Sequence, residues 1–214
     1  MSKSLDAFYR FLDEPIFPWA RVALGFLTIF VALSFTAPMW FINMKAPQYP
    51  EGLDLYIYSY KVEGGNDGND LQEINVLNHY IGMAPLDRTA FSDLDWIPFL
   101  FAAMIIFALR TAVIGKVGSM VDLLVMTTYA GIFGFGRLYY KLYTFGHNLD
   151  SRAPVTVDPF TPVMIGKKQI ANFLTEAGPG LGTIYVSIFA TGLTALLLAH
   201  LIIGRKRHLA SLGA

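Results

Sequence analysis

Two long uncharged apolar stretches constrain the fold of this chain more than any other feature. Val22–Phe41 runs for 20 residues without a charge, and Gly178–Gly204 is also uncharged if His200 is neutral. A helix of about 20 residues is roughly 30 Å long, which matches the hydrocarbon core of a bilayer. The chain is 54% hydrophobic and 15% charged, whereas soluble domains are about one-quarter charged. These features predict an integral membrane protein.

Two further spans are predicted in the middle of the chain. Trp96–Leu109 is apolar up to Arg110. Leu123–Gly136 is apolar after Asp122, and residues 111–118 between the two stretches resemble a tight turn. Because a lone charge inside a membrane is costly, we predict that Arg110 and Asp122 contact each other near the membrane face. The alternative is that Arg110 extends to the headgroups and Asp122 lies at the interface.

The sequence therefore predicts an all-α membrane protein, organised as a single integral membrane domain over residues 1–214. Its two outer loops are expected to contain minor β and short-helix structure. The expected transmembrane helices cover about 22–43, 96–114, 118–142 and 179–204, and the loops cover 45–95 and 143–177.

The distribution of lysine and arginine predicts the orientation. The two long loops, with the second counted from Arg137, hold eight basic residues, as many as the termini and the turn, but spread over a much longer chain. The first loop also carries nine acidic residues. We therefore expect both termini in the cytoplasm and both loops outside it, in a multi-pass protein of the bacterial inner membrane.

Composition also excludes several kinds of site. The chain contains no cysteine, which rules out disulfides, iron–sulfur clusters and thiolate metal sites. A membrane haem would need a second histidine at the depth of His200, and none is available. No haem is therefore expected, and His200 is expected to pack at the interface. The formal charge of zero gives no footprint for nucleic acid. No catalytic motif is present, so the chain is not expected to be an enzyme.

The two loops contain recognisable local patterns. The alternating, tyrosine-rich run 53–62 predicts a strand. After an acidic, glycine-rich stretch at 63–70, Asp70 is expected to cap a short helix over 71–80. In the second loop, residues 137–143 are expected to extend the third span beyond the bilayer. Residues 165–174 are expected to form a short amphipathic helix on the membrane surface.

The candidate metal site combines residues of both loops. His79 and Met83 are four residues apart, although Gly82 is expected to end the helix between them. His147 lies in the second loop, where Asp150 is placed to orient its imidazole. Imidazole and thioether groups are ligands that copper(I) accepts. The alternative is that His79 forms a hydrogen bond within its loop, that Met83 packs on the bilayer, and that Asp150 simply terminates a helix.

Four stretches of the two loops form a set: residues 46–53, Asn78 to Met83, Gly146 to Asp150, and residues 165–169. Together they resemble a known family of small four-helix membrane proteins, which are encoded beside atypical nitrous oxide reductases and their copper maturation factors. The resemblance covers both loops in order, with similar spacing. The motif residues that it carries over are Asn78, His79, Met83, His147, Asn148 and Asp150. The chain departs from the family in its long polar amino terminus and its acidic, glycine-rich first loop.

The resemblance implies a non-catalytic accessory protein that supports an extracytoplasmic copper enzyme of denitrification. Its task would be copper handling, docking or electron supply, with copper as the possible cofactor. The alternative is a structural auxiliary subunit of a larger respiratory or copper monooxygenase complex. In that case, partner helices would pack on Gly131, Gly134 and Gly136. A quinone-binding subunit is a third class, which requires a pocket that the sequence does not show.

Overall fold

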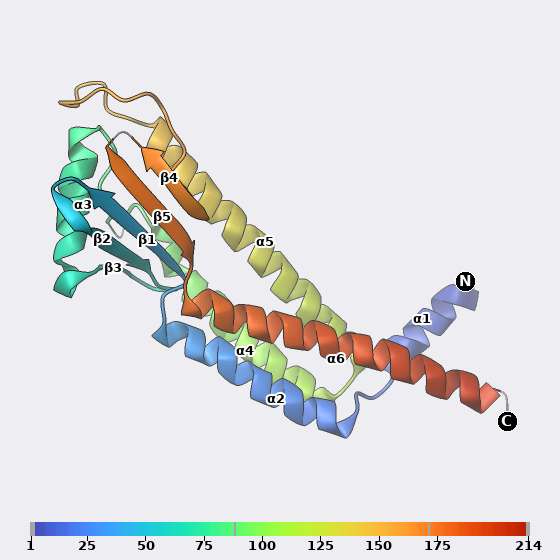
Figure 1. Ribbon diagram of the computed structural model, residues 1–214. Helices are drawn as coiled ribbons and strands as arrows, with labels where there is room; N and C mark the ends of the chain where they lie inside the picture. The colour runs from blue at the N-terminus through green and yellow to red at the C-terminus, as the bar shows by residue number, and fades with distance from the viewer. Residues whose placement is uncertain (1–2, 88, 171, 213–214) are drawn as a thin grey trace. The chain divides into compact units, whose positions relative to one another are not determined.

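Four helices in the computed structural model are long and apolar enough to cross a membrane (Figure 1). The structure describes residues 3–87, 89–170 and 172–212. The prediction of four spans is therefore confirmed at the level of length and composition. The candidate spans are Pro18–Thr36, Ile97–Ile114, Val117–His147 and Leu181–Gly204.

The chain divides into two compact units. The helical unit comprises Met1–Leu33, Phe99–Gly131 and Tyr185–Ala214. The sheet unit comprises Ser34–Pro98 and Ile132–Ile184. The sequence prediction treated residues 1–214 as one membrane domain and did not separate these units.

The long helices belong mainly to the helical unit, and α5 is shared between the two units. Helix α5 contributes its first half to the helical unit and its second half to the sheet unit. The core of the helical unit is apolar and includes Leu24 of α2, Met104 of α4 and Phe189 of α6. The helices are α1 (Lys3–Asp13), α2 (Pro18–Leu33), α4 (Ile97–Ile114), α5 (Val117–His147) and α6 (Leu181–Leu212).

A tight turn joins α4 and α5, and the segment before α2 pairs with it. Gly115 has a φ of 67°, which glycine adopts without the steric cost of a side chain. The N–H of Ile16 donates to the Gly115 carbonyl at 2.8 Å, and the N–H of Val117 donates to the Glu14 carbonyl at 3.0 Å. Lys116 Nζ lies 2.8 Å from Asp13 Oδ1. The predicted turn is thus confirmed, and it is shorter than residues 111–118.

The predicted contact between Arg110 and Asp122 is wrong. Both side chains are exposed, and no ion pair joins them in the described part of the chain. Their neighbours Thr111 and Leu123 are buried, and consecutive residues of a helix lie about 100° apart around its axis, so the two charges face outward. The connection uses a different contact, in which Thr111 Oγ1 donates to the Ser119 carbonyl at 3.2 Å.

The sheet unit contains a five-stranded antiparallel sheet in the order β3-β2-β1-β5-β4 (Figure 1). Central strand β1 pairs Ile42 with Leu55 on one side and with Ala177 on the other. The fold is therefore mainly helical with a substantial sheet, rather than all-α with minor β content. The strands are β1 (Trp40–Ala46), β2 (Tyr49–Ile57), β3 (Val62–Gly64), β4 (Gly166–Ile170) and β5 (Phe173–Pro179).

The first predicted span extends too far toward the carboxyl terminus. We predicted a helix over 22–43, but α2 ends at Leu33 and a 3-10 turn, η1 (Ser34–Thr36), follows it. Pro38 has no N–H to continue a helix. Residues from Trp40 onward instead form ladder hydrogen bonds with strands on both sides.

The amphipathic helix predicted at 165–174 is also wrong. This segment forms β4, a turn and the start of β5. Its apolar and polar residues fit either period over so short a run. The choice is made by strand pairing, since β5 lies against β1 over the whole register from Trp40↔Pro179 to Lys45↔Leu174.

The other local predictions in the first loop are confirmed in part. The strand expected at 53–62 is β2 followed by a turn, in which the N–H of Tyr58 donates to the Lys61 carbonyl, and then β3. The expected short helix is α3 (Asn69–Tyr80). Asp70 does not cap it, because its Oδ2 accepts a hydrogen bond from the N–H of Asp54. Two 3-10 turns complete the loop, η2 (Asn66–Gly68) and η3 (Ser92–Asp95).

The core of the sheet unit brings the sheet together with α3 and the end of α5. Ile74 of α3 is fully buried, and Phe145 of α5 is in the same cluster. These side chains pack against inward residues of the sheet such as Leu55. The core therefore positions the ends of α3 and α5, from which His79 and His147 extend.

Candidate functional site

The two polar stretches singled out in the sequence lie against each other within the sheet unit. The N–H of Asp150 donates to the Gly82 carbonyl at 2.9 Å, and the N–H of Val155 donates to the Tyr80 carbonyl at 3.0 Å. Gly82 has a φ of +78°, and a Cβ there would lie 2.7 Å from the Asp150 carbonyl oxygen. Only glycine permits this approach. The prediction that the two loops meet is confirmed.

A shared hollow of about 500 Å³ lies where these loops meet. It brings together His79, Met83 and Asp150, three of the four predicted metal ligands. Gly82 ends α3 as predicted, and the turn that follows still leaves His79 and Met83 on one lining. We call this feature the loop hollow. Its lining is His79, Gly82, Met83, Ala84, Pro85, Asn148, Leu149, Asp150, Arg152 and Ala153.

His147 does not line the loop hollow. Its ring stacks on Tyr143 with 3.8 Å between the ring centroids. Its Nδ1 lies 2.9 Å from the Tyr143 carbonyl oxygen. Because a carbonyl only accepts, Nδ1 carries a proton, and in the neutral form of the ring Nε2 has the free lone pair. This tautomer is the one found in metal-ligating histidines whose other nitrogen donates to a carbonyl.

Asp150 is bound to Arg152 rather than to an imidazole. Asp150 Oδ1 accepts from the Arg152 backbone N–H at 2.9 Å, and the guanidinium donates to both carboxylate oxygens at 3.2 and 3.1 Å. These hydrogen bonds from Arg152 hold the pKa of Asp150 below its usual value, and the charge of His79 contributes a smaller effect in the same direction. The expected Asp150–His147 pair is therefore not formed.

Only some of the side chains at the loop hollow are ligands that a soft metal prefers. In the described residues, no three histidine, aspartate or glutamate side chains gather in a way that could hold a metal ion. His79 and Met83 supply one imidazole and one thioether, which copper(I) accepts. A four-ligand set of His79, Met83, His147 and Asp150 is not assembled in this arrangement.

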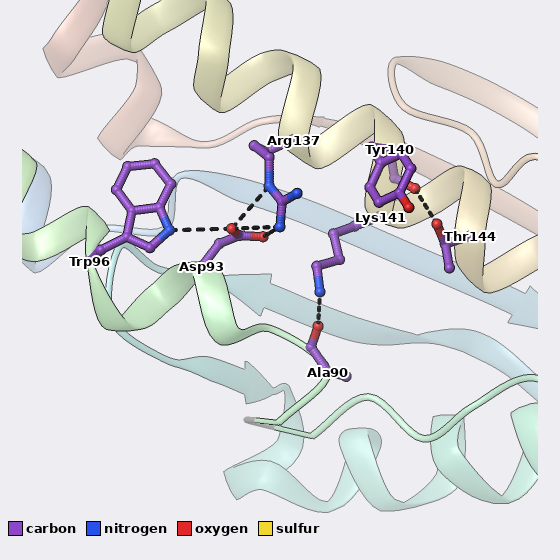
Figure 2. Close-up of polar contacts among 7 residues, drawn as sticks. All are labelled: Ala90, Asp93, Trp96, Arg137, Tyr140, Lys141 and Thr144. Carbon is purple, nitrogen blue, oxygen red and sulfur yellow. Dashed lines mark hydrogen bonds and ion pairs between the residues drawn. The ribbon is translucent and has the colours of Figure 1, made fainter.

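A polar cluster that the sequence analysis missed joins η3 to α5 (Figure 2). Arg137 Nε and Nη2 each donate to an oxygen of Asp93 at 3.0 Å. The indole Nε1 of Trp96 also donates to Asp93, at 3.2 Å. One turn along α5, Lys141 Nζ donates to the Ala90 carbonyl at 2.7 Å. The cluster holds the segment before α4 against α5. The sequence signal for it is an acidic residue, Asp93, just before the second predicted span and a basic residue, Arg137, near the end of the third.

His200 has a structural role in the helical unit, as the sequence predicted. It is buried, and its Nε2 accepts the N–H of Phe17 at 2.8 Å. Its Nδ1 lies 2.8 Å from the Leu196 carbonyl oxygen, so Nδ1 carries the proton and the ring is neutral. The imidazole also stacks on Phe17 with 4.3 Å between the centroids. His200 thus binds α6 to the start of α2.

Comparison with known proteins assigns no family to the chain. No protein-family model matches it, and no curated protein matches it either. The family resemblance noted in the sequence stays an expectation.

Proposed function

We propose that this chain is a non-catalytic, multi-pass membrane accessory protein that handles copper(I) for an extracytoplasmic copper enzyme. In this proposal the loop hollow receives the ion. It then passes the ion to the partner enzyme, or it serves as the surface on which that enzyme docks. Both loops face the compartment outside the cytoplasm. The system it serves is of the nitrous oxide reductase type.

The observation that carries the proposal is the position of His79 and Met83 on one lining. An imidazole and a thioether from residues four apart offer copper(I) two soft or borderline donors without a thiolate. A site with few ligands exchanges its ion more readily than a closed one, which suits transfer rather than storage. Asp150 is paired with Arg152, which reduces the negative charge at the loop hollow.

The remaining residues of the site hold its shape. Gly82 and Asp150 keep the second loop against the end of α3. His147, with its lone pair on Nε2, stands one helical turn after Tyr143 at the end of α5. It is available to a partner protein or to an ion that leaves the hollow.

Copper(I) titration of the purified full chain in detergent, in competition with a chromogenic chelator, tests the metal part. We expect one ion per chain. His79→Ala and Met83→Leu should each weaken binding about tenfold or more, as expected for the loss of a ligand or its immediate support. Met164→Leu is the matched control, because Met164 packs on the core of the sheet unit. Equal affinity in the wild type, His79→Ala and Met83→Leu would refute the metal part.

The accessory part is tested by affinity purification from native membranes. We expect a copper enzyme or its maturation factors to co-purify, and the yield of active partner enzyme to fall in the His79→Ala strain. If the partner's copper content is unchanged in that strain, copper handling is not the task of this chain.

The alternative, a structural auxiliary subunit without a metal of its own, is favoured by a separate observation. A Cβ built at Gly131, Gly134 or Gly136 would meet nothing within 4 Å, so this stretch of α5 is open to a close-packed helix of a partner. Gly134→Leu should then release the chain from a larger complex without changing copper binding. Gly25→Leu is the matched control, since Gly25 is equally open on α2.

A further inference from the structure

An apolar cavity of about 70 Å³ lies beside the core of the sheet unit. Strands β1, β2 and β5 contribute to its walls, as do α3 and the end of α5. Four phenylalanine rings line it, and Met44 and Met83 bring two thioether side chains. Apart from Asn78 and Thr175, the lining residues that the structure describes are apolar.

Asn78 stands out because it is buried in these walls with an unused hydrogen-bond donor. Its side chain is 2% exposed. Its backbone carbonyl accepts the N–H groups of Ile81 and Met83, which end α3. The side-chain amide nitrogen has no hydrogen-bond partner among the described residues. A buried donor without an acceptor is costly, and native structures contain few of them.

The size of the cavity limits what can supply the missing acceptor. An apolar cavity of about 150 Å³ holds a benzene ring, whereas an ordered water needs two to four polar partners. This cavity has about half that volume, so the substituted ring of a quinone is too large, whereas a molecule of about five heavy atoms is of comparable size. Among the described residues, the walls offer Asn78 and Thr175 as polar side chains, which favours a mostly apolar occupant.

We propose that this cavity is a binding site for a slender, neutral, lipid-soluble molecule with a single oxygen acceptor. The oxygen, in a carbonyl or ester group, accepts a hydrogen bond from Asn78 Nδ2. The unbranched apolar part lies among the phenylalanine and methionine side chains. Met83 lines both this cavity and the loop hollow, but the ligand proposed here is a neutral organic molecule and its binding is tested without copper.

The two methionines in the walls provide a direct readout. The chain has eight methionines, and labelling their methyl groups with ¹³C gives a small number of NMR signals. Met44→Leu and Met83→Leu variants assign the two cavity signals. The probes are butan-2-one and 2-methylbut-1-ene, which have the same shape but differ in that only the ketone carries an acceptor. Titration of the full chain in detergent should shift the Met44 and Met83 signals.

The decisive quantity is the ratio of the two half-saturation concentrations. Since micelles take up the alkene more than the ketone, this ratio is compared between the wild type and Asn78→Leu, a substitution of similar size without a donor. We expect the preference for the ketone to fall at least fivefold in Asn78→Leu. Leu77→Phe, which fills the cavity, should abolish the shifts caused by both probes.

Three results would overturn the proposal. The ratio could be the same in the wild type and Asn78→Leu. The shifts at Met44 and Met83 could persist in Leu77→Phe. Both probes could leave the Met44 and Met83 signals unshifted at saturation, which is the result expected of a cavity that stays empty or holds water. If Asn78→Leu does not fold, Asn78→Ser replaces it, with the ratio again expected to fall.

Discussion

At the scale of single residues, the ion pairs of this protein differ in what they contribute. Arg137 and Asp93 form a two-point contact in which the side chains are 36% and 15% exposed. Lys61 and Glu63 also form a close pair, but with 38% and 45% exposure. Solvent screens the second pair more, and exposed pairs contribute little to stability.

Asp93→Asn should therefore lower the stability of the sheet unit. Arg137 would lose its countercharge and one of two charged hydrogen bonds, at a cost of about 1–2 kcal/mol in the free energy of unfolding. Thermal unfolding in detergent, followed by near-UV circular dichroism, measures the change in Tm. Glu63→Gln is the matched control and should cost less than about 1 kcal/mol. An equal loss in both variants would contradict the difference argued here.

Tyr49 gives a prediction about pH. Its hydroxyl donates to the Glu73 carboxylate, and this hydrogen bond, with smaller effects of burial and charge, raises the pKa of Tyr49 above its usual value. The raised pKa favours the neutral phenol in the folded protein. The stabilisation is therefore fully present below a pH of about 10 and is lost as the pH rises through the folded-state pKa.

Ultraviolet titration at alkaline pH measures this effect. The chain has 11 tyrosines, so the curve for Tyr49 is the difference between the wild type and Tyr49→Phe. We expect its midpoint above 10, and in the Glu73→Gln background we expect it to move down. A difference curve that is unchanged by Glu73→Gln would contradict the role given to that hydrogen bond.

At the scale of elements, the contact between the end of α3 and the loop after α5 depends on one glycine. Gly82→Ala places a Cβ 2.7 Å from the Asp150 carbonyl oxygen and also requires a positive φ. We expect a loss of stability of about 1–2 kcal/mol from the backbone alone. We also expect faster hydrogen exchange of the Asp150 amide, which donates to the Gly82 carbonyl.

Gly68→Ala separates these two causes. Gly68 has a similar positive φ of 91°, but a Cβ there meets nothing within 4 Å. It should carry the backbone cost without affecting exchange at Asp150 or copper(I) binding. If Gly82→Ala leaves the Asp150 amide as protected as Gly68→Ala does, the two loops are held together by other contacts.

At the scale of the whole molecule, the orientation in the membrane is predicted from the lysine and arginine distribution. Because the chain has no native cysteine, single cysteines report topology without background. Ser151→Cys, at an exposed position in the sheet unit, should react with an impermeant thiol reagent in intact spheroplasts. Ser211→Cys should react only after permeabilisation. The reverse pattern would place the loop hollow in the cytoplasm and refute the proposed role.

The sequence alone determined the features that depend on local composition. Two long uncharged stretches and two shorter apolar stretches joined by a turn predict four spans, because the thickness of the bilayer selects for length and apolarity. Local signals also predict where two helices end. Gly82 predicts the end of α3, and residues 137–143 predict the extension of α5 through Tyr143. The polar stretches around His79 and His147, one in each loop, also predicted where the two loops meet.

Only the tertiary structure decided how distant segments pair. Ile42 and Ala177 are partners in the sheet, yet no local period in residues 165–174 predicts that pairing. The ion pair of Arg137 with Asp93 and the unused donor of Asn78 likewise depend on neighbours that are distant in the sequence. Hydropathy acts within a segment, whereas the orientation of a side chain depends on packing between segments far apart in the chain.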